Sequence, residues 1–166
     1  MFTFSGLANI GSKAVGSLKK ALKGVLDEPK LTLSVGVFSE ATREGSKTTV
    51  AQYAAYNEFG TTKIPPRPFL RPTMEERQEE WTEAVKGSVS SSLKGGQFNN
   101  RSILELIGEG AVKDVKARIM SNVPPPNAPS TVARKKAKGI EPIRTLYETG
   151  LMHASVEYKI EEGEPS

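Results

Sequence analysis

Residues 50–72, with the sequence VAQYAAYNEFGTTKIPPRPFLRP, decide how the middle of this chain folds. Thr49 can cap a helix that begins at residue 50, and Gly60 stands where a left-handed C-terminal stop is expected. One face of this helix is marked by residues at three- and four-residue steps, namely Val50, Tyr53, Ala54 and Asn57. The pattern predicts a helix that ends at Phe59.

A segment rich in proline follows this helix, with Pro65, Pro66 and Pro68. Each proline fixes its own φ and pushes the preceding residue toward extended geometry. Residues 63–70 are therefore predicted to be stiff and to present Arg67, Phe69 and Arg71 in a nearly fixed arrangement. Such stiffness suits docking, because little conformational entropy is lost when the segment meets a partner.

Residues 31–38 and 154–161 both show the two-residue alternation of half-buried strands. Two such strands of equal length favour pairing. We predict an α+β fold, with a small, mostly antiparallel sheet formed by these strands and with residues 65–70 at one edge. Several amphipathic helices would cover the sheet, and long loops would join the elements.

Three further segments have the apolar spacing of amphipathic helices: residues 6–26, a stretch after Pro72 whose apolar residues run to Leu93, and residues 101–121. The serines within 88–92 and the glycines at 95 and 96 are expected to fray the end of the second helix. Thr73 would cap the second of these helices, and Trp81 would be its packing anchor. In the third, the apolar residues repeat every four positions at Ile103, Ile107, Ala111, Val115 and Ile119. Residues 39–48 are polar and predict a mobile loop, and the prolines of residues 122–129 predict an extended spacer.

The chain has 166 residues, which suits a single domain over 1–166. The segment 1–28 would be peripheral, and residues 161–166 would form a flexible acidic tail. No apolar run approaches the roughly 20 residues that a membrane-spanning helix needs, and the N-terminus lacks the layout of a signal peptide. The sequence thus predicts a protein that is made and used in the cytoplasm, with no membrane partner.

Catalytic chemistry finds little support in this composition. There is no cysteine, and His153 is the only histidine, so a metal site or a catalytic triad would depend on one residue. No phosphate-binding glycine motif follows a predicted strand. We predict no enzyme activity, no catalytic, metal-binding or cofactor-binding residues, and no cofactor. His153 is expected at a surface or an interface.

The net charge of +4 is unevenly distributed. Residues 101–139 carry eight basic and three acidic residues, whereas residues 140–166 carry two basic and six acidic ones. Opposite surfaces of neighbouring copies could therefore attract each other, although ordinary solvated charge explains the pattern equally well. The candidates for a weak, sequence-independent DNA contact are Arg134, Lys135, Lys136 and Lys138. No aromatic residues lie among them to stack bases, which favours a subunit interface or a solvated loop.

Three quoted pieces carry a resemblance to a known family: residues 50–72, STVARKK at 130–136, and PIRTLYETGLMHASVEYKI at 142–160. Together they resemble the neck and tail-completion proteins of tailed bacteriophages, a family related to lambda protein Z and to the virion-morphogenesis proteins of Mu-like and P2-like phages. The last piece is similar to a family element in which a turn ending in Thr-Gly precedes a short helix and a final strand.

The resemblance implies a structural virion protein that completes the tail and helps to join it to the head. It implies a homo-oligomeric ring, hexameric because phage tail tubes have six-fold symmetry, located in the neck of the virion after assembly in the host cytoplasm. The implied partners are other neck and tail proteins, with a non-specific contact to packaged DNA. A tail-terminator ring and, in another class, a small DNA-binding module remain alternatives.

The interface residues expected from the resemblance lie on the helix stop, the stiff segment and the second turn. They are Asn57, Glu58, Phe59, Gly60, Thr61, Pro65, Arg67, Pro68, Phe69, Arg71, Thr149 and Gly150. Glu58 is expected to bind Arg67 or an arginine of a neighbouring subunit, and Phe69 is expected to fill a pocket. A purely structural role within the monomer stays open for all of them.

Overall fold

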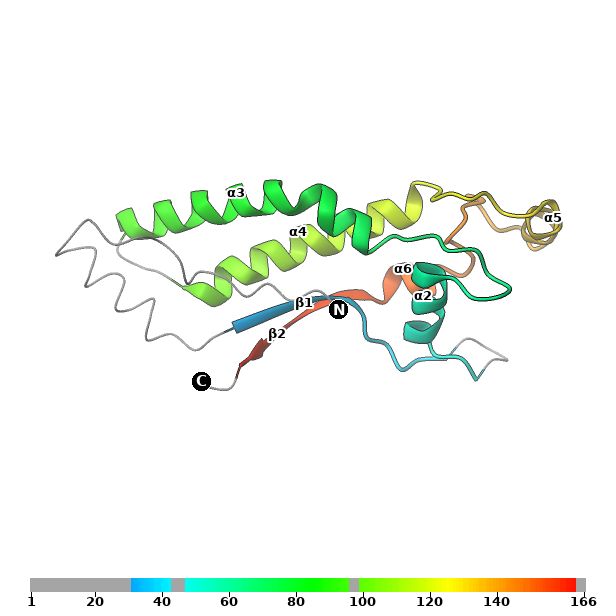
Figure 1. Ribbon diagram of the computed structural model, residues 1–166, viewed down its shortest axis with the longest axis horizontal. Helices are drawn as coiled ribbons and strands as arrows, with labels where there is room; N and C mark the ends of the chain where they lie inside the picture. Colours follow the sequence, from blue (N-terminus) through cyan, green and yellow to red (C-terminus); the bar gives the residue numbers. More distant parts are fainter. Residues whose placement is uncertain (1–30, 43–46, 96–98, 164–166) are drawn as a thin grey trace. The chain divides into compact units, whose positions relative to one another are not determined.

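The computed structural model describes residues 31–42, 47–95 and 99–163. Figure 1 shows its elements in chain order: β1 (Leu31–Val37), α2 (Val50–Phe59), α3 (Arg71–Gly95), α4 (Asn100–Met120), α5 (Pro129–Ala137), α6 (Leu151–Ala154) and β2 (Val156–Glu162). The helix predicted over residues 6–26 and the peripheral segment 1–28 lie outside the described residues. So do residues 164–166 of the predicted tail, whereas Glu161 and Glu162 belong to β2.

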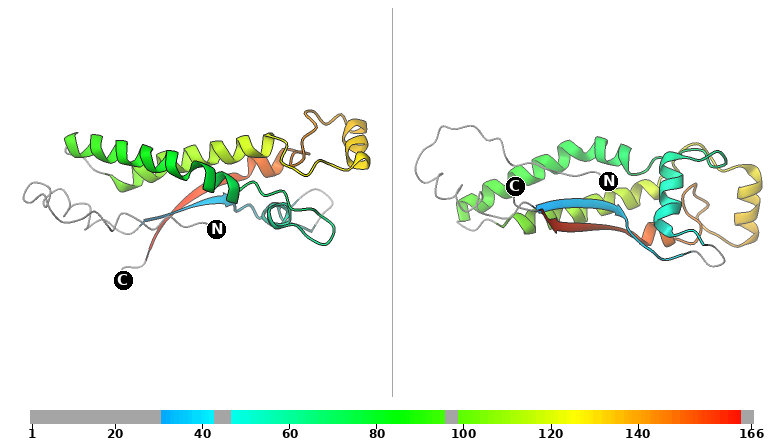
Figure 2. Two further views of the ribbon diagram at one scale, coloured as in Figure 1. Left: turned by 45° about the horizontal axis from the view of Figure 1, so that its top comes forward. Right: turned by 60° about the horizontal axis from the view of Figure 1, so that its bottom comes forward.

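The predicted α+β fold is confirmed. Within the described ranges, five helices accompany a two-stranded antiparallel sheet that packs against helices. The two strands lie side by side in the right-hand view of Figure 2. None of the described helices is both long enough and apolar enough to cross a membrane.

The edge strand predicted over residues 65–70 is wrong. In the described part of the chain the sheet contains β1 and β2 alone, and residues 65–69 have no regular secondary structure. Prolines have no N–H to give to a neighbouring strand, and the N–H of Arg67 donates to the carbonyl oxygen of Asn57 at 2.6 Å. The segment is therefore tied to the end of α2 instead of to the sheet.

The two strands differ in burial. Val156, Tyr158 and Ile160 of β2 are less exposed than Glu157 and Lys159, which is the predicted alternation. In β1, by contrast, four consecutive residues, 33–36, are buried. Both faces of β1 are therefore covered, and the half-buried strand expected there is wrong.

The chain divides into two compact units. The first takes the described residues within Met1–Val35, Gln78–Gly110 and Tyr158–Ser166, and the second takes Gly36–Arg77 and Ala111–Glu157. In the first unit, Trp81 and Ile103 are buried, as predicted for packing residues. There α4 comes very close to β2, because a Cβ on Gly108 would lie 2.6 Å from Cγ of Tyr158.

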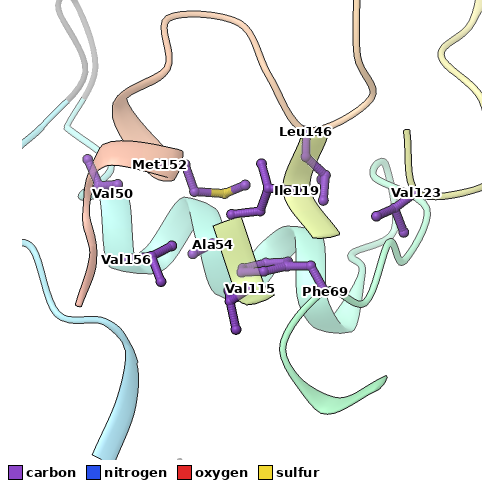
Figure 3. Packing of buried hydrophobic residues seen from close by; sticks show 9 residues of the cluster. All are labelled: Val50, Ala54, Phe69, Val115, Ile119, Val123, Leu146, Met152 and Val156. Atoms are coloured by element: carbon purple, nitrogen blue, oxygen red, sulfur yellow. The ribbon is translucent and has the colours of Figure 1, made fainter. Parts of the chain in front are cut away.

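The second unit contains the main apolar core (Figure 3). Its members come from α2, the proline segment, α4, the spacer after α4, the turn before α6, α6 itself and β2: Val50, Ala54, Phe69, Val115, Ile119, Val123, Leu146, Met152 and Val156. Val115 and Ile119 belong to the four-residue repeat of α4, and both are 0% exposed. That repeat therefore predicted the buried face of α4 correctly.

The basic stretch 130–136 is helical, which the sequence analysis did not predict. Pro129 occupies the start of α5, where its fixed φ suits a helix and its missing N–H has no cost. Arg134, Lys135 and Lys136 lie in the last turn, where positive charge is favoured by the helix dipole. The stretch is therefore an ordered element and not a solvated loop.

Candidate assembly surface

Helix α2 provides one wall of the candidate site. Its start is fixed by a capping box, in which the N–H of Gln52 donates to Oγ1 of Thr49 and the N–H of Thr49 donates to Oε1 of Gln52. Its end is Gly60, with φ 78° and ψ 171°, a conformation that essentially only glycine adopts. The positive φ agrees with the prediction, but the ψ is not that of a left-handed helix. A Cβ here would also lie 3.0 Å from Pro66.

The second wall is the turn around Thr149 and Gly150. As predicted, this turn precedes a short helix, α6, and the final strand. Gly150 has a left-handed φ of 74°, and a Cβ there would lie 3.1 Å from the hydroxyl of Tyr147. Glycine is thus needed at this position both for the backbone angle and for the close approach of Tyr147.

A pocket of about 390 Å³ lies between these two walls. Its lining is mostly apolar or hydroxylated, with one charged side chain, and consists of Thr48, Thr49, Val50, Tyr53, Tyr56, Ile64, Leu146, Glu148, Thr149, Gly150, Leu151 and Met152. The pocket therefore joins the helix of the first matched piece to the Thr-Gly turn of the last one. All of its lining residues belong to the second compact unit.

The side chain of Glu58, near the end of α2, binds the residues at the start of α3. Its carboxylate accepts the backbone N–H groups of Phe69, Leu70 and Arg71 at 2.7, 2.9 and 3.1 Å, and the Nε of Arg71 at 3.0 Å. Helix α3 begins at Arg71, so the N–H of Arg71 has no partner within the helix, and those of Phe69 and Leu70 belong to the two residues just before it. Glu58 thus caps α3 from outside it.

This arrangement corrects two expectations. Thr73 does not cap α3, because it lies inside the first turn and its hydroxyl donates to the carbonyl oxygen of Phe69 at 2.7 Å. Glu58 does not bind Arg67, since the arginine beside its carboxylate is Arg71. Burial by itself raises the pKa of Glu58, but the hydrogen bonds from Leu70, Phe69 and Arg71 hold this pKa below its ordinary value.

The side chains of Arg67 and Phe69 are both buried within their own chain. The Nε of Arg67 donates to the carbonyl oxygen of Pro125 at 2.7 Å, and an Nη donates to that of Pro126 at 3.2 Å. Phe69 is 0% exposed and lies at the centre of the core (Figure 3). The stiff proline segment therefore joins α2 to the spacer 122–129, and the pocket filled by Phe69 belongs to its own chain.

Among the expected interface residues, Phe59 is the large apolar one that is exposed. Its ring is 65% exposed, and the guanidinium carbon of Arg71 lies 4.8 Å from the ring centroid. This is a cation–π contact, and it holds a large apolar side chain in a defined direction on the surface.

The expected interface residues thus separate by exposure. The buried ones are Asn57, Glu58, Arg67 and Phe69, and the half-buried ones are Gly60, Pro68, Arg71 and Gly150. The exposed ones are Phe59, Thr61, Pro65 and Thr149. Sequence reasoning missed most of the pocket lining, including Tyr56, Leu146, Glu148 and Met152. Tyr56 alone gave a signal, because it is an aromatic residue placed outside the core stripe of its helix.

The four candidates for a DNA contact are largely engaged within the chain. Lys135 is 3% exposed, and its Nζ donates to the carbonyl oxygens of Arg144 and Tyr147 at 2.6 Å each. Arg134 and Lys138 approach the carboxylate of Glu148 at 3.5 and 3.8 Å. Lys136 is exposed. Lys135 is therefore a structural residue that holds the segment before the Thr-Gly turn against α5.

The remaining polar contacts complete this support. Asn122 accepts the N–H of Thr145 at 3.1 Å, and the Nδ2 of Asn127 donates to the carbonyl oxygen of Arg144 at 3.2 Å. The spacer 122–129 and helix α5 thus position residues 144–147, which carry part of the pocket wall. Residues distant in sequence are needed to shape this surface.

His153 lies on α6 and is half-buried. Its ring meets that of Tyr147 edge to face, with centroids 6.4 Å apart. Burial and the positive charge of Lys116 lower the pKa of His153. Among the described residues, no group of three or more His, Asp or Glu side chains is placed to hold a metal ion.

The site as a whole is suited to recognising another surface. It offers an apolar pocket with rigid walls and, near it, an exposed aromatic ring. Comparisons with protein-family models, with curated proteins and with solved structures found no match for this chain.

Proposed function

We propose that this chain is a structural protein of the neck of a tailed bacteriophage, where it completes the tail and helps to join it to the head as a homo-oligomeric ring. In this proposal the subunit works by presenting rigid complementary surfaces and catalyses no reaction. Six copies would match the symmetry of the tail tube, and the assembled ring would reside in the virion.

One observation supports this role above the others. The first and last pieces of sequence that carry the family resemblance, although far apart in the chain, provide the two walls of one mostly apolar pocket. Each wall is held by specific hydrogen bonds: the capping box on α2, and the contacts of Lys135 behind the turn. A preformed pocket favours association, because little conformational freedom is lost when a partner binds.

A small DNA-binding module is supported less well. Three of the four basic residues that would carry it are engaged with backbone carbonyls or with Glu148. Weak DNA contact in the channel of a ring remains compatible with the proposal. A salt titration checks it, since phosphate contacts give an affinity that falls steeply as salt increases.

The decisive experiment is to delete the coding sequence from the phage genome that carries it and to image the particles that form. The proposal expects DNA-filled heads and separate tails, with joining restored when the wild-type protein is supplied in trans. Tails of abnormal length would indicate a tail terminator instead. Normal joining without the protein would overturn the proposal.

A further inference from the structure

Large exposed apolar side chains are few in the described part of the chain. They are Tyr56, Phe59 and Leu106, with 40%, 65% and 54% exposure. Two of the three lie within one turn of each other at the end of α2. Since Tyr56 also lines the pocket, the apolar surface of α2 continues from the pocket toward Phe59.

Helix geometry places Phe59 and the pocket on different flanks of α2. Successive residues are about 100° apart around a helix, so Phe59 points away from the core, on the side opposite Val50. Tyr53, which lines the pocket, points about 120° away from Phe59. Phe59 is flanked by Arg71 from the start of α3, whereas the pocket is closed by residues 146–152 on the other flank. The exposed ring therefore cannot fill the pocket of its own chain.

We infer that the Phe59 ring of one copy inserts into the pocket of a second copy, and that this contact closes the ring. The inference rests on the proposed function and identifies the contact surfaces. Because the ring and the pocket are different patches of the same subunit, the contact is head-to-tail. A head-to-tail contact leaves one patch unused at each end until a closed ring forms.

The chemistry of the two patches is complementary. A pocket of about 390 Å³ is at the low end of the volumes that hold drug-sized ligands, roughly 300–1,000 Å³, and is ample for one aromatic side chain. Tyr53, Tyr56, Ile64 and Met152 supply apolar contact for the ring. The one charged lining residue, Glu148, is already paired with Arg134 and Lys138, so the contact with an incoming ring is mainly apolar.

Three variants test this contact without touching the core. Phe59→Ala removes the inserted ring, and Thr149→Trp fills the pocket from an exposed position. Leu106→Ala is the matched control, because it removes an exposed apolar side chain elsewhere. Light scattering during size-exclusion chromatography measures the mass, and circular dichroism verifies folding. We expect each of the first two variants to weaken self-association at least about 30-fold, as for a central aromatic contact, while the control assembles like the wild type.

Mixing the two defective variants gives the sharper result. The Thr149→Trp chain keeps Phe59, and the Phe59→Ala chain keeps an open pocket, so one productive contact remains between them. A head-to-tail contact predicts a one-to-one dimer that cannot grow, from two proteins that are separately monomeric.

The failures of the two proposals can be told apart. If the wild type stays monomeric at high concentration, or if Phe59→Ala and Thr149→Trp assemble as well as Leu106→Ala, the inferred contact is wrong, whatever the phage deletion shows. If the mixing experiment succeeds but the deletion leaves joining intact, the contact stands and the neck role falls.

Discussion

Replacing Glu58 by glutamine tests how α2 and α3 are joined. The substitution keeps the size of the side chain and one acceptor oxygen, but it removes the charge. It also places an NH₂ group among the backbone N–H groups of Phe69, Leu70 and Arg71, which now donate to the carboxylate at 2.7–3.1 Å. At least one of these donors then loses its partner.

The size of the effect follows from those contacts. Loss of a helix cap costs about 0.5–2 kcal/mol, and a buried donor without a partner costs about 1–3 kcal/mol. Since Glu58 is only 2% exposed, water cannot replace the lost bonds. We expect Glu58→Gln to lower the free energy of unfolding by about 2–4 kcal/mol. Glu58→Ala should cost about 3–5 kcal/mol, because it leaves the partner groups wholly unsatisfied.

Two assays measure this change. Urea unfolding followed by circular dichroism should show a midpoint lowered by about 1–3 M for a 3 kcal/mol loss. Amide hydrogen exchange should show faster opening at residues 69–71. Glu79→Gln is the matched control on the exposed face of α3 and should change stability by less than about 0.5 kcal/mol. Equal effects of the two substitutions would refute the capping role.

Acid should reduce the difference between the wild type and Glu58→Gln. The folded-state pKa of Glu58 lies below its ordinary value, so the charged form contributes stability above the unfolded-state pKa of about 4.3. This contribution is lost as the pH falls through the folded-state pKa. The difference measured at pH 7 should therefore shrink at lower pH, and a constant difference would contradict the assignment.

Three further predictions concern individual residues of α4, α5 and α6. Gly108→Ala should destabilise the protein by about 1–3 kcal/mol in thermal unfolding, because its Cβ would lie 2.6 Å from the ring of Tyr158. The control is Gly110→Ala on the same helix, whose Cβ meets nothing within 4 Å, and it should stabilise the protein by about 0.5–1 kcal/mol. Lys135→Met should lower the free energy of unfolding in urea by about 2–4 kcal/mol, since two carbonyl oxygens lose a charged donor. Lys136→Met, at an exposed position, should leave it nearly unchanged. An NMR titration should find the pKa of His153 below its ordinary value, and Lys116→Gln should raise it; an unchanged value would contradict the electrostatic cause.

Elements that depend on local pattern could be predicted from the sequence. The alternation around residues 31–37 and 156–160 identified both strands, and Thr49 as a cap with Gly60 as a stop gave both ends of α2. These signals are local, because side-chain period and cap chemistry depend on residues a few positions apart.

The contacts that shape the candidate site could not be predicted in this way. Glu58 caps a helix that begins 13 residues later, so its acceptor role depends on how the proline segment turns back. Lys135 belongs to a basic run, and only the packing of residues 144–147 against α5 shows that it is the inward member. Thr73 had the right chemistry for a cap, but the carboxylate of Glu58 already held the start of α3 two residues earlier.

The pocket draws its walls from residues 48–64 and 146–152, which are separated by about half of the chain. A polypeptide that stops before residue 146 still contains all of α2, including Phe59, but it has no second wall. Such a polypeptide would also lack three members of the apolar core, Leu146, Met152 and Val156, so the pocket and the core of this unit depend on the same late segment of the chain.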